Sequence, residues 1–160
     1  MPLRSNLMKV MQPVPYVDSV DTSYLESLLG YNARRAALSV IEVFLQRMAV
    51  YDLRPVDFSV LSLITHNPGI TSKQLSNSLN ILAPNLVAMV NGLERKGMIS
   101  RQPHPHDGRA MGLHLTDSGL EIMRQAEKTA SELEIESTPN LSTSERKTLL
   151  RLLQKVYFKP

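Results

Sequence analysis

The sequence contains no cysteine and no tryptophan, and aromatic residues make up only 5% of its 160 residues. Without cysteine there is no disulfide bond, no thiolate metal ligand, no cysteine nucleophile and no thiol redox sensor. No apolar run approaches the ~20 residues that a membrane-spanning helix needs, and the N-terminal residues lack the charged start and apolar core of a signal peptide. We therefore expect a soluble, cytoplasmic protein.

Features typical of an enzyme are also missing. The sequence has neither a glycine-rich phosphate-binding loop nor a pair of carboxylates on a predicted pocket wall. Three histidines, at positions 104, 106 and 114, lie in and beside a proline-containing loop, and no second ligand pair follows at helical spacing. We expect no metal, no cofactor and no catalytic activity.

The charge balance is mildly basic, with 18 Lys and Arg against 15 Asp and Glu and a sequence pI of about 9.3. Such a balance favours acidic partners only weakly, so the positions of the charges matter more than their sum. The length suits one domain, or a small domain with an added oligomerisation element.

The apolar residues predict one long amphipathic helix after an extended, proline-containing arm over residues 1–22. "SYLE", which follows the arm, has the Ser-x-x-Glu form of a helix-opening capping box. The apolar residues after it keep the i, i+3, i+4 spacing for over six turns, and Pro55 favours an end before it. A helix from Ser23 to about Arg54 would be about 45 Å long. Because a small domain is narrower than that, we expect this helix to reach a partner.

The rest of the pattern predicts further helices and two short strands. "HNPG" ends one helix, Thr71 and Gln74 open a short one in capping-box form, and Pro84 suits the first turn of the next. Short strands at "MIS" and "GLHL" flank a turn, and Thr116 and the Ser142–Glu145 box open the last two helices. Two short helices followed by a hairpin are the winged form of the helix-turn-helix. We therefore expect a mainly α fold with a small β-hairpin wing.

Three motifs around the hairpin carry a family resemblance. They are Leu-Glu-Arg-Lys-Gly ending at Gly97, Asp-Gly-Arg at 107–109, and Leu-Thr-Asp-Ser-Gly ending at Gly119. In this order and spacing, they make the sequence similar to the MarR family of winged-helix transcriptional regulators. The resemblance implies a homodimeric repressor that binds a pseudo-palindromic operator in double-stranded DNA and responds to a small effector. It also implies three regions: an arm over 1–22, a helical dimerisation region over 23–54 and 117–160, and a winged helix-turn-helix domain over 55–116.

The resemblance assigns roles to the residues of the wing. Arg109 is expected to enter or border the minor groove, where a narrow groove concentrates negative potential. Asp107 cannot favour DNA itself, so we expect it to stabilise the wing through a partner such as Arg95 or Arg109. Arg101 and His106 are expected to reach the phosphate backbone. The alternative is a solvated turn whose charges touch nothing.

The expected recognition helix departs from the family pattern. If Leu86, Met89, Val90 and Leu93 face the core, the 100° step per residue turns another set of residues outward. Where many relatives carry serine, threonine or arginine, this helix has small or uncharged residues, which suit close approach, thymine methyl contacts and adenine recognition by asparagine. The expected DNA contacts on this helix are Pro84, Asn85, Ala88, Asn91 and Arg95, and those on the preceding helix are Ser72, Lys73 and Gln74, which would bind phosphate.

The effector site is expected near the segment "LLGYNARRAALSV", which places Tyr31, Arg34 and Arg35 within one turn of an apolar helix. An arginine there would pair with a carboxylate or phosphate of an aromatic or anionic effector. "GYNARRA" is similar to the subgroup that controls the breakdown of aromatic acids, some members of which sense the coenzyme A thioester. The alternatives are a solvated Arg34 or an ion pair between subunits.

Two other functional hypotheses stand beside the repressor. One is a small enzyme, against which the missing motifs argue. The other is a winged-helix interaction module with little or no DNA binding, which the uncharged recognition helix favours. A salt titration against duplex DNA separates this module from a DNA-binding protein, because phosphate contacts make affinity fall steeply with salt.

Overall fold

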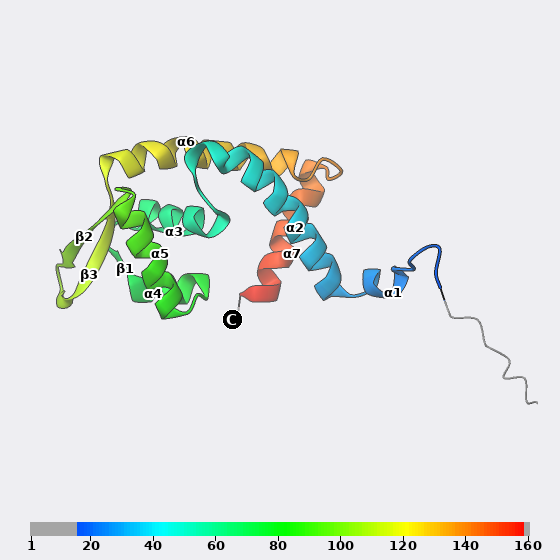
Figure 1. Ribbon diagram of the computed structural model, residues 1–160, viewed down its shortest axis with the longest axis horizontal. Helices are drawn as coiled ribbons and strands as arrows, with labels where there is room; N and C mark the ends of the chain where they lie inside the picture. The colour runs from blue at the N-terminus through cyan, green and yellow to red at the C-terminus, as the bar shows by residue number, and fades with distance from the viewer. Residues whose placement is uncertain (1–15, 159–160) are drawn as a thin grey trace, which may run out of the picture. The chain divides into compact units, whose positions relative to one another are not determined.

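The computed structural model describes residues 16–158, so residues 1–15 of the predicted arm lie outside the described part. The chain divides into two compact units, residues 1–35 and 36–160. The boundary falls inside helix α2 (Leu29–Met48), which is labelled in Figure 1.

The first unit contains a break that the sequence pattern did not predict. Helix α1 spans only Ser23–Glu26, and α2 begins at Leu29, so the expected single helix from Ser23 is wrong. Thr22 is the N-cap residue, and its hydroxyl donates to Glu26 Oε1 at 2.5 Å. The Asn32 side chain then donates to the carbonyl oxygens of Glu26 and Leu28 at 2.7 and 2.8 Å. Such side-chain bonds compete with the helical ladder and favour a break.

The predicted end of this helix is also wrong. Helix α2 ends at Met48 and continues as one 3₁₀ turn, η1 (Ala49–Tyr51). Asp52 follows with φ of 52°, in the left-handed region that terminates helices. The chain therefore leaves the helix before Arg54, and a short extended segment leads into α3.

The second unit carries the helix-turn-helix, the wing and the two C-terminal helices. Its capping boxes at Thr71–Gln74 and Ser142–Glu145 are present as predicted, and Thr116 caps a helix by accepting from the Gly119 backbone N–H. Pro84 lies in the first turn of its helix. The elements are α3 (Pro55–His66), β1 (Ile70–Thr71), α4 (Ser72–Leu79), α5 (Ala83–Arg95), β2 (Ile99–His104), β3 (Asp107–Leu115), α6 (Asp117–Glu136) and α7 (Thr143–Tyr157).

The wing is a three-stranded antiparallel sheet in the order β1-β3-β2, rather than the two-stranded hairpin expected (Figure 1). Strand β1 contributes two residues, with Ile70 opposite Leu113. Strands β2 and β3 pair from Ile99 opposite Leu115 out to the tip, where the register shifts between Pro103 and His104. The added strand ties the base of the wing to the start of α4, because α4 begins directly after β1.

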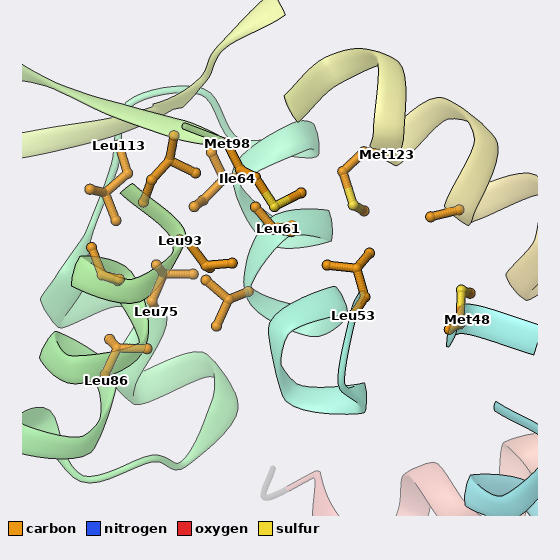
Figure 2. Close-up of a cluster of buried hydrophobic side chains, with 14 of the residues drawn as sticks. Met48, Leu53, Leu61, Ile64, Leu75, Leu86, Leu93, Met98, Leu113 and Met123 are labelled. Atoms are coloured by element: carbon orange, nitrogen blue, oxygen red, sulfur yellow. The ribbon is translucent and has the colours of Figure 1, made fainter. Parts of the chain in front are cut away.

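The core lies between the helix-turn-helix, the sheet and α6. Figure 2 shows Leu61 and Ile64 of α3 close to Leu93 of α5, with Leu113 of the sheet and Met123 of α6 beside them. All five are at most 2% exposed. At roughly 1.5–3 kcal/mol for each fully buried side chain, this shared core fixes how α5 and the wing are presented.

Candidate nucleic-acid interface

Helix α5 buries one face and leaves the opposite face outward. Leu86, Val90 and Leu93 are buried, as their spacing predicted, whereas Met89, expected in the core, is only half-buried. Pro84, Asn85, Ala88 and Arg95 are exposed, and Asn91 is half-buried. The helix therefore presents the side that the sequence pattern assigned to DNA.

Helix α4 supplies the neighbouring polar groups. Gln74 Oε1 accepts hydrogen bonds from both the backbone N–H and the hydroxyl of Thr71, each at 2.9 Å. Because its carbonyl oxygen belongs to the capping box, only the amino group of Gln74 is left for a phosphate. Ser72 is half-buried and Lys73 is exposed. A shallow groove of about 280 Å³ between α4 and α5 is lined by Ser72, Lys73, Ser76, Asn77, Ala83, Leu86 and Val87.

The wing tip carries an arginine, Arg109, whose side chain has no ion-pair partner in the described part of the chain. Asp107 Oδ1 accepts a hydrogen bond from the backbone N–H of Arg109 at 3.0 Å. Among residues 16–158, the side chains of Asp107 and Arg109 take part in no ion pair with each other or with Arg95. The carboxylate thus shapes the turn through the backbone, and the exposed guanidinium of Arg109 remains available. His106 is exposed in the same turn.

Arg101 lies differently from the phosphate ligand that the sequence suggested. It starts on β2 and reaches α5, where its Nε donates to Glu94 Oε2 at 3.1 Å. Its terminal nitrogen donates to the side-chain oxygen of Asn91. Arg101 therefore joins the wing to the recognition helix. Glu94 was not among the predicted site residues. Its position three residues after Asn91, on the same side of the helix, was the signal in the sequence that one side chain could contact both.

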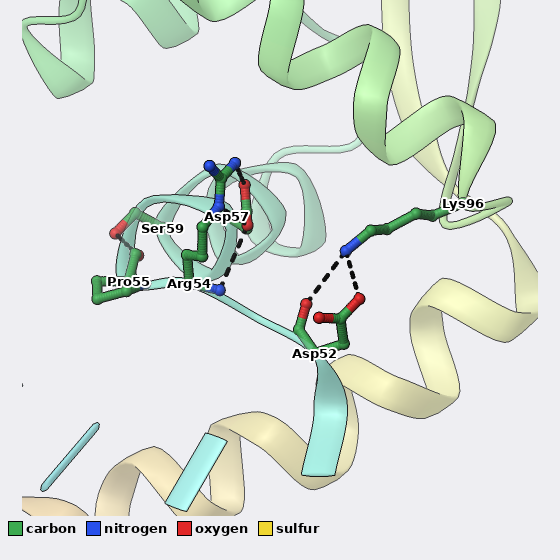
Figure 3. A network of polar contacts seen from close by, with 6 residues as sticks. All are labelled: Asp52, Arg54, Pro55, Asp57, Ser59 and Lys96. Carbon is green, nitrogen blue, oxygen red and sulfur yellow. Dashed lines mark hydrogen bonds and ion pairs between the residues drawn. The ribbon is translucent and has the colours of Figure 1, made fainter. Parts of the chain in front are cut away.

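The other flank of α5 faces a charged network at the start of α3 (Figure 3). The Arg54 guanidinium donates to both carboxylate oxygens of buried Asp57, at 2.7 and 2.8 Å. Burial alone would raise the pKa of Asp57, but the hydrogen bonds from the Arg54 side chain and backbone, with the charges of Arg54 and Lys96, hold that pKa below its usual value. Lys96 in turn lies 2.7 Å from Asp52 Oδ2.

A hollow of about 550 Å³ opens between this network and α5. Three cationic side chains, those of Arg54, Arg95 and Lys96, lie on its wall, but Arg54 is paired with Asp57 and Lys96 with Asp52. Within residues 16–158, Arg95 is therefore the cation of this wall that has no ion-pair partner. Arg54 was not among the predicted site residues either. The signal in the sequence was Asp57, because an acid three residues after the N-cap position is typical of a capping box. The full lining is Arg54, Asp57, Asn85, Ala88, Met89, Gly92, Leu93, Arg95 and Lys96.

The predicted effector residues lie on the first turns of α2, in the first unit. Tyr31 is half-buried, and Arg34 and Arg35 are exposed. Their spacing places them within about one helical turn, as the sequence indicated.

The histidines of the wing contact each other. The rings of His104 and His106 pack edge to face at 6.1 Å, and the His106 backbone N–H donates to His104 Nδ1 at 3.3 Å. Within residues 16–158, no three histidine, aspartate or glutamate side chains are arranged to hold a metal ion. In the same part of the chain, no helix is both long and apolar enough to cross a membrane.

Comparison with known proteins places this geometry in a family. A model of the MarR family matches residues 53–111. The multiple antibiotic resistance protein MarR of Salmonella typhimurium is 34% identical over 106 residues, covering 66% of this chain and 74% of that protein. The transcriptional repressor CouR bound to a 23-mer DNA duplex superposes with a TM-score of 0.82 and 38% identity, over 88% of this chain and 99% of that one. CouR bound to p-coumaroyl-CoA superposes with a TM-score of 0.79 and 36% identity, over 89% of this chain and 100% of that one.

The fold, the outward face of α5 and the wing define a winged helix-turn-helix DNA-binding protein. The chain belongs to the MarR family. It is a MarR-type DNA-binding transcriptional repressor, in a family of regulators rather than enzymes. The predicted fold class is confirmed, with β1 as an addition to the wing.

Proposed function

We propose that the protein is a homodimeric, ligand-responsive repressor whose operator is pseudo-palindromic and whose effector is an aromatic acid or its coenzyme A thioester. The observation that carries the DNA contact is the exposed face of α5 beside a wing whose Arg109 guanidinium has no ion-pair partner among residues 16–158. Its site of action is the cytoplasm, where the operator DNA lies.

The dimer is supported by apolar surface that one chain leaves uncovered. In α7, Leu150, Leu153 and Val156 are 46%, 42% and 68% exposed. Ile41 and Leu45 of α2, in the same unit, are 38% and 49% exposed. Large apolar side chains left exposed along one helix, as here, are typical of an interface. A second copy would cover them, and its two-fold axis would place two recognition helices about 10 base pairs apart.

The effector proposal rests on likeness and on charge. CouR, which is known in complex with p-coumaroyl-CoA, is similar over 89% of this chain. A coenzyme A thioester carries several phosphates, and the wall of the hollow beside α5 carries Arg95 together with Arg54 and Lys96, which are paired with Asp57 and Asp52. Tyr31, Arg34 and Arg35 are kept as further proposed ligand-binding residues. Because α5 forms one wall of the hollow, an occupant there would favour one position of the recognition helix over others.

The sequence alone also allowed a winged-helix module with little DNA binding, against which membership of the MarR family now argues. Pro84 and Ala88 occupy outward positions of α5 and carry no charge, which favours that alternative. The repressor is favoured by the exposed wing arginine Arg109 and by Lys73 of α4 and Arg95 of α5, which are exposed as well.

The decisive experiment selects bound sequences from a randomised duplex library and then titrates the selected duplex over a salt series. A repressor gives a two-fold symmetric consensus and a steep fall of affinity with salt, whereas the module gives neither. p-Coumaroyl-CoA, free p-coumarate and free coenzyme A are then added to the complex. Release by the thioester alone supports a thioester effector, release by p-coumarate supports the acid, and release by none excludes p-coumaroyl-CoA and p-coumarate as effectors.

A further inference from the structure

We infer that Arg101 determines sequence specificity by holding the side-chain amide of Asn91, so that Asn91 meets the DNA as a hydrogen-bond donor only. The inference rests on the proposed contact of α5 with DNA and adds a residue that itself need not touch a base. Arg101 thus acts as a positioning residue within the interface.

The geometry fixes which end of the Asn91 amide Arg101 holds. A guanidinium has only donors, so it binds the amide oxygen and not the amide nitrogen. Arg101 holds that oxygen with its terminal nitrogen while its Nε donates to Glu94 Oε2 at 3.1 Å. Asn91 and Glu94 are three residues apart and lie on the same side of α5. Two bonds from one rigid, planar group therefore set the orientation of the amide.

The amide nitrogen must then face away from Arg101. The oxygen and nitrogen of an amide point in different directions from the same carbon, and the oxygen is turned toward the Arg101 guanidinium. By helical spacing, the opposite side of Asn91 is the exposed face where Ala88 and Arg95 lie. The N–H groups of Asn91 are therefore the part that an occupant of this face meets.

A donor-only asparagine recognises a different set of base edges. Bidentate contact with adenine needs the amide oxygen to accept from N6 while the nitrogen donates to N7. The amide oxygen has two lone pairs, but it is turned toward Arg101 and away from the exposed face, so the N–H groups are the part of Asn91 that meets a base. These groups suit acceptors such as guanine N7 and O6 or thymine O4, and they disfavour the cytosine amino group. The adenine contact expected from the sequence would appear only when Arg101 releases the oxygen.

The phosphate-binding alternative for Arg101 fits the geometry less well. The Arg101 side chain is only 31% exposed, and both ends of its guanidinium already have partners. A phosphate would have to break the contacts with Asn91 and Glu94 to bind it. Among residues 16–158, the Arg109 side chain has no ion-pair partner, so the wing already carries an exposed cation on the neighbouring strand β3.

The test compares base preference in the wild-type protein and in Arg101→Ala. The operator position contacted by Asn91 is first found as the one whose preference disappears in Asn91→Ala. At that position, the wild type should bind guanine at least as well as adenine. Arg101→Ala should prefer adenine by about tenfold, because the freed amide makes a second hydrogen bond. Arg101→Lys keeps the charge and the aliphatic stem but loses the fork, so it should shift the preference in the same direction and stays useful if Arg101→Ala unfolds.

Arg109→Ala is the matched control, since it removes a wing cation without touching Asn91. It should weaken binding by the same factor on duplexes that differ only at the Asn91 position, and so leave the guanine-to-adenine ratio unchanged. An equal ratio in the wild type and both Arg101 variants overturns the inference, as does a wild type that already prefers adenine. If Asn91→Ala changes no position, Asn91 meets no base and the inference also fails. If the wild-type protein selects no duplex at all, the proposed function has failed instead.

Discussion

The Thr116 hydroxyl donates a hydrogen bond to the carbonyl oxygen of Gly97 at 2.6 Å. Gly97 ends the first family motif and Thr116 is the second residue of the third, so the two motifs that frame the wing in sequence meet at its base. The same hydroxyl accepts from the Gly119 backbone N–H at 3.0 Å, and the Thr116 N–H donates to the Met98 carbonyl oxygen at 3.0 Å. The start of α6 is thereby fixed against the start of β2.

Gly119→Ala should destabilise the protein strongly. An added Cβ at this position would lie 2.1 Å from the Met98 carbonyl oxygen, which is backbone and cannot swing away as a side chain would. Relief would require α6 to move from the wing, at a cost of about 2–3 kcal/mol. Urea-induced unfolding of both proteins measures this loss.

Gly92→Ala is the matched control for that experiment. Gly92 also lies in a helix, but a Cβ added there would meet no heavy atom within 4 Å beyond its own helical turn. Alanine is the better helix former, so this change should stabilise the protein by about 0.5–1 kcal/mol. Equal effects of the two substitutions would show that the contact with Met98 is not what requires glycine at 119.

The features that the sequence predicted well are those decided within a few residues. The boxes at Thr71–Gln74 and Ser142–Glu145 close through bonds between residues three apart, so the pattern alone locates them. The same pattern failed at "SYLE", because Thr22, one residue earlier, is the N-cap residue instead of Ser23. Asn32 then takes the carbonyl groups that would continue the helix.

The features that the sequence did not predict depend on residues far apart in the chain. Strand β1 is two residues long, too short for a period, and its pairing with Leu113 is decided by the fold. Arg101 on a wing strand has the composition of a phosphate ligand, and only the packing of β2 on α5 gives it Asn91 and Glu94 as partners. Local chemistry therefore located the elements, and tertiary contacts decided what their side chains touch.

Asp57 should make stability depend on pH in the acid range. Its pKa is lower in the folded protein than in the unfolded chain, where it is about 3.9, so the folded state gains stability above that value. This stability is lost as the pH falls through the folded-state pKa. Asp57→Asn should remove that part of the acid dependence and lower stability at pH 7 by about 1–3 kcal/mol. Unfolding measured in both proteins from pH 7 to about pH 2, a range that extends below the unfolded-state pKa, tests the prediction.

Arg54→Ala removes the ion-pair partner of the buried Asp57 carboxylate. Without the guanidinium, burial raises the pKa of Asp57, so the stabilising effect of ionisation at neutral pH should disappear. Arg54→Ala and the double variant with Asp57→Asn should then be similarly stable, since the pair acts as one unit. Additive losses in the double variant would mean that Asp57 is stabilised by something other than Arg54.

The proposed dimer predicts an effect of charges on α7. Leu150→Glu together with Leu153→Glu places two carboxylates on the exposed apolar stripe. Burying them in an interface is costly, so the dimer dissociation constant should rise at least about a hundredfold. Light scattering over a concentration series measures it. Arg151→Glu, about 100° around the helix from Leu150, should leave the dimer intact. A wild-type monomer at micromolar concentration would contradict the proposal.

The proposed role of the wing predicts that Arg109→Ala weakens operator binding. Each subunit would lose one cationic contact, so the slope of log affinity against log salt should become shallower by about 0.9 for each, or about two units for the dimer. If the guanidinium lies in a narrow minor groove, the loss should be larger on duplexes with A-tracts facing the wing than on G·C-rich ones. Affinity measured over a salt series on both kinds of duplex checks this.

Two control variants identify why Arg109→Ala weakens operator binding. Arg109→Lys keeps the charge, so it should retain most of the salt slope while losing part of the preference for a narrow groove, because lysine is a more strongly hydrated point charge. Asn91→Ala should instead concentrate its loss at one operator position, at about 1–3 kcal/mol if it contacts a base. The Arg109 side chain is exposed and lies outside the core, so both Arg109 variants should unfold like the wild type. If Arg109→Ala leaves affinity and slope unchanged in a folded protein, the wing does not engage DNA, and Asp107 and Arg109 form a solvated turn.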